Sequence, residues 1–446
     1  MRIMVKFTRE FYKKDVDCLK KSGKFKKFIC FTIAAVCGVT FVTATANSRV
    51  AKTEKEKAKS YSEVEIDKKP VPEKDENGNW VFTTDRDFKV VQLTDVHIGA
   101  GYMSYKKDLM AFNAVASMIT REKPDLVIVT GDMSYPVPFQ AGTFNNKNST
   151  VAFAELMESL GVYWTVTLGN HDSESYSYYS REKIAEIYTD EKYTHCLFEK
   201  GPEAIDGYGN HTIEVKNSKG IITRAFVMLD SHSYTDGDYF GLFWKYDNIH
   251  QNQVDWYRSE IKRMNTENSK TIKAIQGDTN GGLFKEYGTV KTLAFFHIPL
   301  VEMLDGWNEF QNNNFKDTEN FKYIGGIIGE TGKRIYPGVG EDELFEAMLE
   351  LGSTKAMFTG HDHYNNVTFS YKDIIFSYGY SVDYLAYVGV SKEGSQRGCT
   401  VITTKPDTTF TIEKFNYYSD RYNSDEFPRE EVVMQFEDVT YQVAEE

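Results

Sequence analysis

The sequence predicts an α/β fold whose β-sheets are covered by helices on both faces. Short apolar runs alternate along the chain with stretches whose apolar residues recur every three or four positions. These are the patterns of buried strands and of amphipathic helices. The strand candidates are continuously apolar, which is typical of sheets buried on both faces. With 446 residues and a hydrophobic content of 41%, the chain is long enough for one large domain or two ordinary ones.

The predicted strands and helices alternate along the chain. Runs rich in Val, Ile, Leu and Phe predict strands at 88–94, 126–130, 164–168, 224–229, 292–296 and 356–359. The three- and four-residue spacing predicts helices at 106–121, 150–160, 180–188, 250–264 and 341–351. Residues 301–340 are rich in Asn and Gly and have little periodicity. We expect them to form a long loop over the functional site, because unusually long loops are often functional.

The N-terminal segment predicts export. Residues 1–27 carry ten Lys or Arg and three acidic residues, and residues 28–46 are uncharged and mostly apolar. A run of this length nearly spans a hydrocarbon core of roughly 30 Å, and lysines before such a run place that end in the cytoplasm. The small residues at 44–46 leave two readings open, a cleaved signal peptide and a signal-anchor helix. In both cases we expect the rest of the chain outside the cytoplasm, extracellular or anchored in the membrane by this helix.

The remainder divides by composition into three parts. We expect a charged linker at 47–79, one folded domain at 80–415 and an acidic tail at 416–446. The formal net charge of −13 would repel a polyanion, which argues against a nucleic-acid partner. Cys196 and Cys399 follow the apolar run; two cysteines are too few for a disulfide framework, and their pairing is left open.

Five polar clusters directly follow predicted strands. They are Asp95-Val96-His97, Gly131-Asp132, Gly169-Asn170-His171-Asp172, His297 and Gly360-His361-Asp362-His363. Each taken alone is typical of a turn or of a buried, hydrogen-bonded histidine. Together they hold five of the nine histidines. Because ligands bind beyond the carboxyl ends of strands in open α/β sheets, this placement predicts one shared site.

The side chains of these clusters are of the kinds that bind two metal ions. Carboxylate, imidazole and amide oxygen, without thiolate, suit Mn, Fe or Zn. A carboxylate such as Asp132 can bridge two ions about 3.5–4 Å apart, and the ions would generate hydroxide from water near neutral pH. An imidazole that is not a ligand can protonate a leaving oxygen.

The ordered set of motifs resembles the calcineurin-like metallophosphoesterase superfamily over roughly residues 85–405. Phe-Phe-His-Ile-Pro-Leu at 295–300 and Phe-Thr-Gly-His-Asp-His at 358–363 resemble its purple-acid-phosphatase-like branch most closely. The resemblance implies a four-layer αββα sandwich of two mixed β-sheets, with His171 as general acid and Asp172 orienting the His171 imidazole. It implies two metal sites that share Asp132, the first completed by Asp95, His97 and His363 and the second by Asn170, His297 and His361.

The first motif departs from that of true purple acid phosphatases. The pattern of those enzymes is D-x-G at the first motif, and they use the tyrosine of G-D-x-x-Y in the second motif as an iron ligand. This chain has His97 at the last position of the first motif and also has a tyrosine, Tyr135, in the second. We expect His97 to be the ligand and Tyr135 to be its neighbour. This departure argues against a ferric ion in the first site and against the purple colour. The expected cofactor is two divalent or mixed-valence transition-metal ions, namely Mn, Fe or Zn.

The resemblance implies hydrolysis of phosphate monoesters by a hydroxide that bridges the two metals. The expected substrate is a phosphorylated small molecule or a phosphoprotein. One alternative is a phosphodiesterase, because the same dinuclear site serves both reactions. The other is a non-catalytic binding module that keeps only the fold.

Overall fold

A computed structural model describes most of the chain from residue 43 onward. The described residues are 43–235, 238, 243, 245–275, 281–332, 334–340, 342–387, 389–390, 397–432 and 439–443. The basic segment 1–27 and most of the apolar run 28–46 therefore lie outside the described residues. Within the described part, no helix is both long enough and apolar enough to cross a membrane.

The first of two sheets has six strands in the order β15-β14-β13-β3-β4-β5. Strands β3, β4 and β5 are parallel to one another, and β13, β14 and β15 extend the sheet by antiparallel pairing. The strands span Phe88–Leu93 (β3), Leu126–Thr130 (β4), Trp164–Thr167 (β5), Gly398–Thr404 (β13), Phe410–Asn416 (β14) and Val439–Val443 (β15).

The second sheet has nine strands in the order β1-β2-β6-β7-β8-β10-β12-β11-β9. Strands β7, β8, β10 and β12 are parallel, so their carboxyl ends lie at one edge. The strands span Glu73–Lys74 (β1), Trp80–Thr83 (β2), His211–Lys216 (β6), Ile222–Met228 (β7), Thr292–Phe295 (β8), Phe321–Gly325 (β9), Thr354–Thr359 (β10), Thr368–Tyr371 (β11) and Ile374–Tyr378 (β12).

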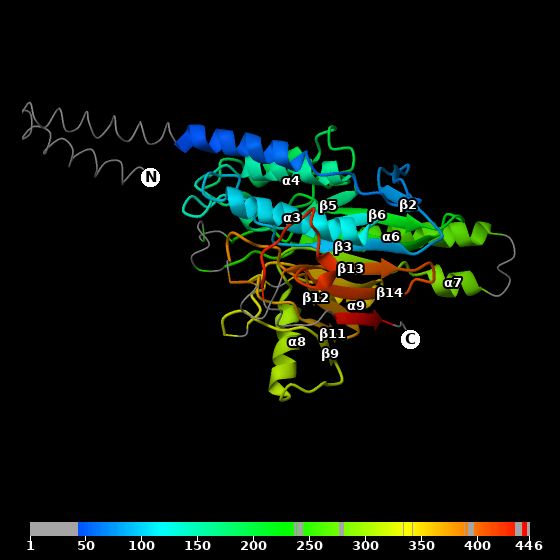
Figure 1. Cartoon of the computed structure of the whole chain (residues 1–446). Helices are drawn as coiled ribbons and strands as arrows, with labels where there is room; N and C mark the ends of the chain where they lie inside the picture. Colours follow the sequence, from blue (N-terminus) through cyan, green and yellow to red (C-terminus); the bar gives the residue numbers. More distant parts are fainter. Residues whose placement is uncertain are drawn as a thin grey trace, which may run out of the picture.

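Helices lie on the outer faces of both sheets, and Figure 1 shows α3 and α4 on one side of the sheets and α8 on the other. The helices span Tyr105–Glu122 (α3), Asn146–Leu160 (α4), Arg181–Tyr188 (α5), Gln251–Ala274 (α6), Gly282–Tyr287 (α7), Val301–Asn312 (α8) and Leu344–Leu351 (α9), with short 3-10 turns at His171–Ser173 and Asp420–Tyr422. A further helix, whose described part covers residues 43–58, precedes β1.

Three hydrophobic cores separate the four layers. Alternate residues of one strand enter different cores, because successive side chains point to opposite faces of a sheet. In β4, Val127 and Val129 pack under α3 and α4, whereas Leu126 and Ile128 pack between the two sheets. In β8, Ala294 instead joins the core under α6, α8 and α9. The four-layer αββα sandwich of two mixed sheets is therefore confirmed.

The predicted strands and helices all occur, but two predicted irregular segments are ordered. Residues 301–340 contain α8 and β9 in place of one long loop. The charge of residues 47–79 suggested a solvated linker, yet Glu54 and Ala58 of the first helix are fully buried. Lys55 of this helix and Lys59, which directly follows it, form ion pairs with Glu155 of α4. The correction arises because the charged side chains form one face of a helix whose other face is packed.

Two further expectations concern the C-terminal part. The acidic tail at 416–446 is in part ordered, since β15 adds an edge strand to the six-stranded sheet. Cys196 and Cys399 are both buried and form no disulfide in the described structure. The boundaries of the expected domain at 80–415 stay a prediction.

Candidate dinuclear metal centre

All five clusters lie just beyond the carboxyl ends of the strands that precede them. Asp95 and His97 follow β3, and Asp132 follows β4. Asn170 and His171 follow β5, so the six-stranded sheet supplies three clusters. The nine-stranded sheet supplies the other two, which follow β8 and β10. The site thus forms where the edges of the two sheets meet.

The backbone around the site has an unusual conformation. Asp95, His97, Asp132 and His361 all have positive φ, between 51° and 80°. A non-glycine residue held in a sparsely populated region costs on the order of 1–3 kcal/mol, and such residues gather at functional sites. Gly360 has no space for a side chain, because a Cβ there would lie 1.9 Å from the Thr94 hydroxyl. The turns that follow these strands are therefore shaped to bring polar side chains inward.

The first group of ligand-type side chains comprises Asp95, His97, Asp132 and His363. All four are buried, and one ligand atom from each lies within 4.8 Å of the others. His363 Nε2 is 3.3 Å from Asp95 Oδ1, and His97 Nε2 is 3.4 Å from Asp132 Oδ2. Two carboxylates and two imidazole nitrogens thus face one point, which is a donor set for a borderline transition metal.

The second group comprises Asn170, His297 and His361, and Asp132 lies between the two groups. His297 Nε2 is 3.1 Å from Asp132 Oδ2 and 3.2 Å from Asn170 Oδ1. His361 Nδ1 is 3.0 Å from the same amide oxygen. His297 Nδ1 donates to the Thr130 carbonyl at 2.7 Å, which leaves Nε2 as the lone-pair nitrogen. Burial lowers the pKa of His361, so its imidazole is neutral and able to bind a metal.

Asp383, which the sequence reasoning missed, lies behind the first group. It is fully buried, and its two carboxylate oxygens are 3.3 Å from His97 Nδ1 and 3.5 Å from His363 Nδ1. Backbone N–H groups of Leu385 and Ala386 also donate to it. A carboxylate on the outer nitrogen of a ligand histidine fixes the tautomer and leaves the inner nitrogen free to bind metal.

The pKa values of the group fit a site for metal cations. Burial opposes the charge on His97, but Asp383 and Asp132 outweigh it and raise the pKa of His97 to about 9. Burial likewise opposes the charge on Asp132, yet His297 and His171 hold the pKa of Asp132 well below its usual value. The buried carboxylates are therefore balanced by positively charged imidazoles. Metal ions would replace the protons of these imidazoles, so the residues present fit a pair of bound ions.

His171 lies at the edge of the site, where its side chain is 22% exposed. Its backbone N–H donates to Asp132 Oδ1 at 2.8 Å, and its Nδ1 is 2.7 Å from Glu174 Oε1. The expectation that Asp172 orients this imidazole is therefore wrong, and the Glu174 carboxylate makes that contact instead. Asp172 is buried and accepts instead from the backbone N–H groups of Asp132, Ser134 and Gly169, at 3.0, 2.9 and 2.8 Å. Two of these donors lie in the segment after β4, so Asp172 links the backbone of that segment to the turn after β5.

Tyr135 has the position of a neighbour. Its ring centroid lies 4.8 Å from that of His97 and 4.9 Å from that of His171. Its hydroxyl donates to Gln140 Oε1 at 3.0 Å, and burial raises its pKa, so the phenol keeps its proton. This geometry is consistent with His97, and not Tyr135, as the ligand.

Comparisons with known proteins place these features in context. A family model described as calcineurin-like phosphoesterase matches residues 88–365. The chain is 28% identical over 327 residues to probable inactive purple acid phosphatase 14 of Arabidopsis thaliana, covering 69% of this chain and 73% of that protein. It is 26% identical over 350 residues to probable inactive purple acid phosphatase 29 of the same plant, covering 75% of this chain and 80% of that protein.

Phosphatase DCR2 of Saccharomyces cerevisiae is 26% identical over 243 residues, covering 50% of this chain and 36% of that protein. Among solved structures, a dimetal phosphatase from Danio rerio is 11% identical with a TM-score of 0.46, covering 81% of this chain and all of that one.

Proposed function

This chain belongs to the calcineurin-like phosphoesterase family, and on that basis we propose that it is a metal-dependent hydrolase of phosphate monoesters. The observation that carries the proposal is the convergence of seven ligand-type side chains beside a partly exposed histidine. Asp132 lies between both groups of ligands, and the backbone of His171 is bonded to Asp132. This hydrogen bond would fix the position of the proposed acid relative to the proposed metal ions.

Two bound ions would supply a nucleophile from water near neutral pH and neutralise charge on the phosphoryl oxygens. Asp95, His97, Asp132 and His363 would hold one ion, and Asp132, Asn170, His297 and His361 the other. The metal is proposed to be Mn, Fe or Zn, because the donor set contains nitrogen and oxygen but no sulfur.

His171 is proposed to donate the proton that the leaving oxygen requires. Its Nδ1 is held by the Glu174 carboxylate, so Nε2 is the nitrogen left to carry that proton. The same carboxylate stabilises the imidazolium before transfer and fixes the orientation of the ring. Tyr234 donates its hydroxyl to Glu174 at 3.1 Å, which in turn holds the carboxylate in place.

The names of the Arabidopsis relatives favour a second candidate, a non-catalytic binding module. Against it, the chain has all seven proposed ligands and the proposed acid, whereas a loss of catalysis is expected to show as a missing ligand or a missing acid. Metal analysis combined with turnover separates the two candidates. We expect two transition-metal ions per chain and hydrolysis of 4-nitrophenyl phosphate; bound metal without turnover of any monoester would favour the binding module.

A phosphodiesterase is the alternative within the same chemistry. Comparison of 4-nitrophenyl phosphate with bis(4-nitrophenyl) phosphate distinguishes the two reactions, because the leaving group is the same in both. A strong preference for the diester would overturn the monoesterase proposal. The proposed substrates are phosphorylated small molecules or phosphoproteins, and the proposed location is outside the cytoplasm, on the strength of the N-terminal segment.

A further inference from the structure

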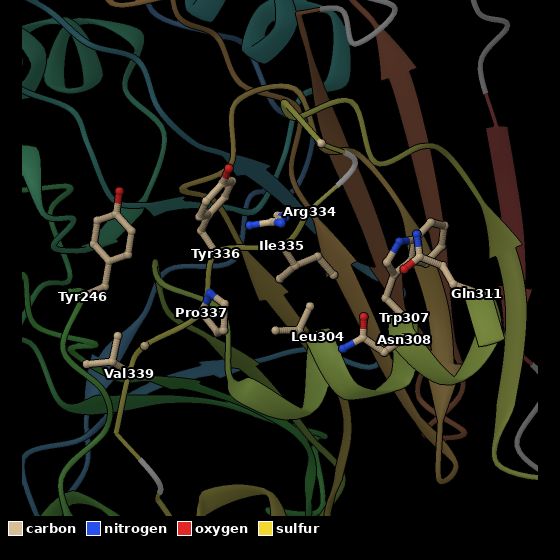
Figure 2. Close-up of a pocket in the computed structure, with 12 residues that line it drawn as sticks. Tyr246, Leu304, Trp307, Asn308, Gln311, Arg334, Ile335, Tyr336, Pro337 and Val339 are labelled. Atoms are coloured by element: carbon tan, nitrogen blue, oxygen red, sulfur yellow. The ribbon is translucent and has the colours of Figure 1, made fainter. Parts of the chain in front are cut away.

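A cavity of about 510 Å³ lies between helix α8 and the segment that follows β9. Figure 2 shows its lining. Leu304, Trp307 and Asn308 come from one side of α8, and Tyr336 lies on the opposite wall. Tyr246 lies on the side of the cavity away from Trp307 and Gln311.

This cavity adjoins the proposed metal centre. The Tyr246 ring meets the His361 ring edge-on, with centroids 4.2 Å apart. The backbone N–H of Tyr336 donates to Asp362 Oδ2 at 3.1 Å, in the motif that carries two of the proposed ligands. On the same wall, the Gly338 N–H donates to the Pro299 carbonyl, two residues after His297. The cavity wall is thus attached to the segments that follow both β8 and β10.

The lining is mostly aromatic and apolar, and Asn308, Gln311 and Arg334 supply polar groups. Tyr246, Trp307 and Tyr336 supply rings, and Leu304 and Ile335 supply aliphatic surface. Pockets for small molecules have this composition and measure about 300–1,000 Å³. A cavity of roughly 150 Å³ already accommodates benzene, so this one has room for fused rings.

We infer that this cavity is the leaving-group site of the enzyme, and that the enzyme takes phosphate monoesters whose leaving group is a fused aromatic ring system. The inference rests on the proposed function, because it places the phosphate at the metal centre and the ring beyond Tyr246. Flat rings stack on the aromatic walls, and each such contact contributes roughly 0.5–1.5 kcal/mol beyond burial of area.

The test compares 1-naphthyl phosphate with phenyl phosphate in variants that fill the cavity. Asn308→Trp fills it from α8, and Val339→Trp fills it from the opposite segment; both residues line the cavity and are exposed, so the fold tolerates the change. Asp305→Trp is the matched control, because Asp305 is exposed on the same helix but does not line the cavity.

We expect kcat/KM for 1-naphthyl phosphate to fall about tenfold relative to phenyl phosphate in both filling variants, the scale of a lost apolar contact, with no change in the control. An unchanged naphthyl-to-phenyl ratio in both filling variants would overturn the inference.

Binding of 1-naphthylmethylphosphonate, measured by calorimetry, separates this inference from the proposed function. If the wild type hydrolyses neither ester but binds the phosphonate, and the filling variants bind it at least tenfold more weakly, the hydrolase proposal fails and the binding site stands. If the wild type hydrolyses both esters and all variants bind the phosphonate equally, the hydrolase stands and the inference fails.

Discussion

The buried carboxyl of Glu54 predicts a pH-dependent attachment of the first helix. Glu54 is fully buried in the helix over residues 43–58. Its neighbour Asp108 is bonded to the backbone N–H groups of Gly99 and Ala100, just after the His97 cluster. Burial, and the charge of Asp108, raise the pKa of Glu54 from 4.5 to about 11. The docked helix therefore keeps Glu54 protonated at neutral pH.

The sign and size of the effect follow from linkage between protonation and folding. Below its unfolded pKa, a carboxyl whose pKa is raised by folding is protonated in both states, and its contribution to the stability of the folded state is fully present. That contribution is lost as pH rises towards the folded pKa, because the unfolded state then loses its proton first. Each pH unit between 4.5 and 11 costs about 1.4 kcal/mol, so the cost between pH 5 and pH 8 is about 4 kcal/mol. Glu54→Gln removes the titrating group but keeps a side chain that can donate to Asp108, so it should abolish this loss.

Amide hydrogen exchange of residues 43–58 measures the effect locally, because a docked helix can open without global unfolding. We expect the protection of this segment in the wild type, corrected for intrinsic exchange, to fall steeply from pH 5 to pH 8. In Glu54→Gln it should fall much less, so the difference in opening free energy between the two should grow by about 1.4 kcal/mol per pH unit. Glu56→Gln, on the exposed side of the same helix, is the control and should match the wild type. A constant difference across this pH range would refute the assignment of a buried, protonated Glu54.

The remaining predictions concern the metal centre. Asp132→Asn should lower metal content at both sites, since Asp132 lies between the two groups; loss of only one ion by elemental analysis would contradict its bridging role. Asp383→Asn should weaken metal binding about 10–100-fold at the site of His97 and His363 only, measured by competition with a chelator, whereas the exposed Asp373→Asn should change nothing. His171→Ala should retain metal and slow hydrolysis by about 10²–10⁴-fold for poor leaving groups and far less for good ones. Glu174→Gln should retain metal and slow hydrolysis of poor leaving groups more than that of good ones, because it weakens the contact that orients His171; wild-type rates for both kinds of substrate would contradict a role for Glu174.

The clusters at the strand ends could be found from sequence because buried strands are the clearest signal in an α/β chain. Asp383 was missed although a related signal was present. The run Ile-Ile-Phe-Ser-Tyr forms β12, which is parallel to β10, so its carboxyl end faces the same edge. Asp383 lies five residues beyond that strand. Recognition of 374–378 as a strand would have brought Asp383 into the candidate site.

Helix α8 was missed for a different reason. Gly306 and the Asn residues near its end resemble a loop in sequence, since glycine disfavours helices by about 1 kcal/mol relative to alanine. In the structure a Cβ at Gly306 would lie 3.0 Å from the Tyr371 ring and 3.1 Å from the Phe369 ring. The glycine therefore allows close packing of the helix against β11. Because this contact joins segments that are far apart in the chain, the local sequence around Gly306 does not indicate it, and the helix could not be predicted from that sequence.

The contribution of both sheets to one centre has a consequence for how the protein matures. Asp95, Asp132 and Asn170 belong to the sheet formed by β3, β4 and β5, and His361 and His363 come nearly two hundred residues after Asn170 in the chain. Long-range contacts of this kind form late, because closing a long loop costs entropy before the contact repays it. A chain that emerges from its N-terminus would carry five of the seven proposed ligands before His361 and His363 have emerged and joined the second sheet. The complete set of ligands for two metal ions would then exist only after the two sheets have packed together. Hydrolysis would therefore begin only in molecules whose sandwich is complete.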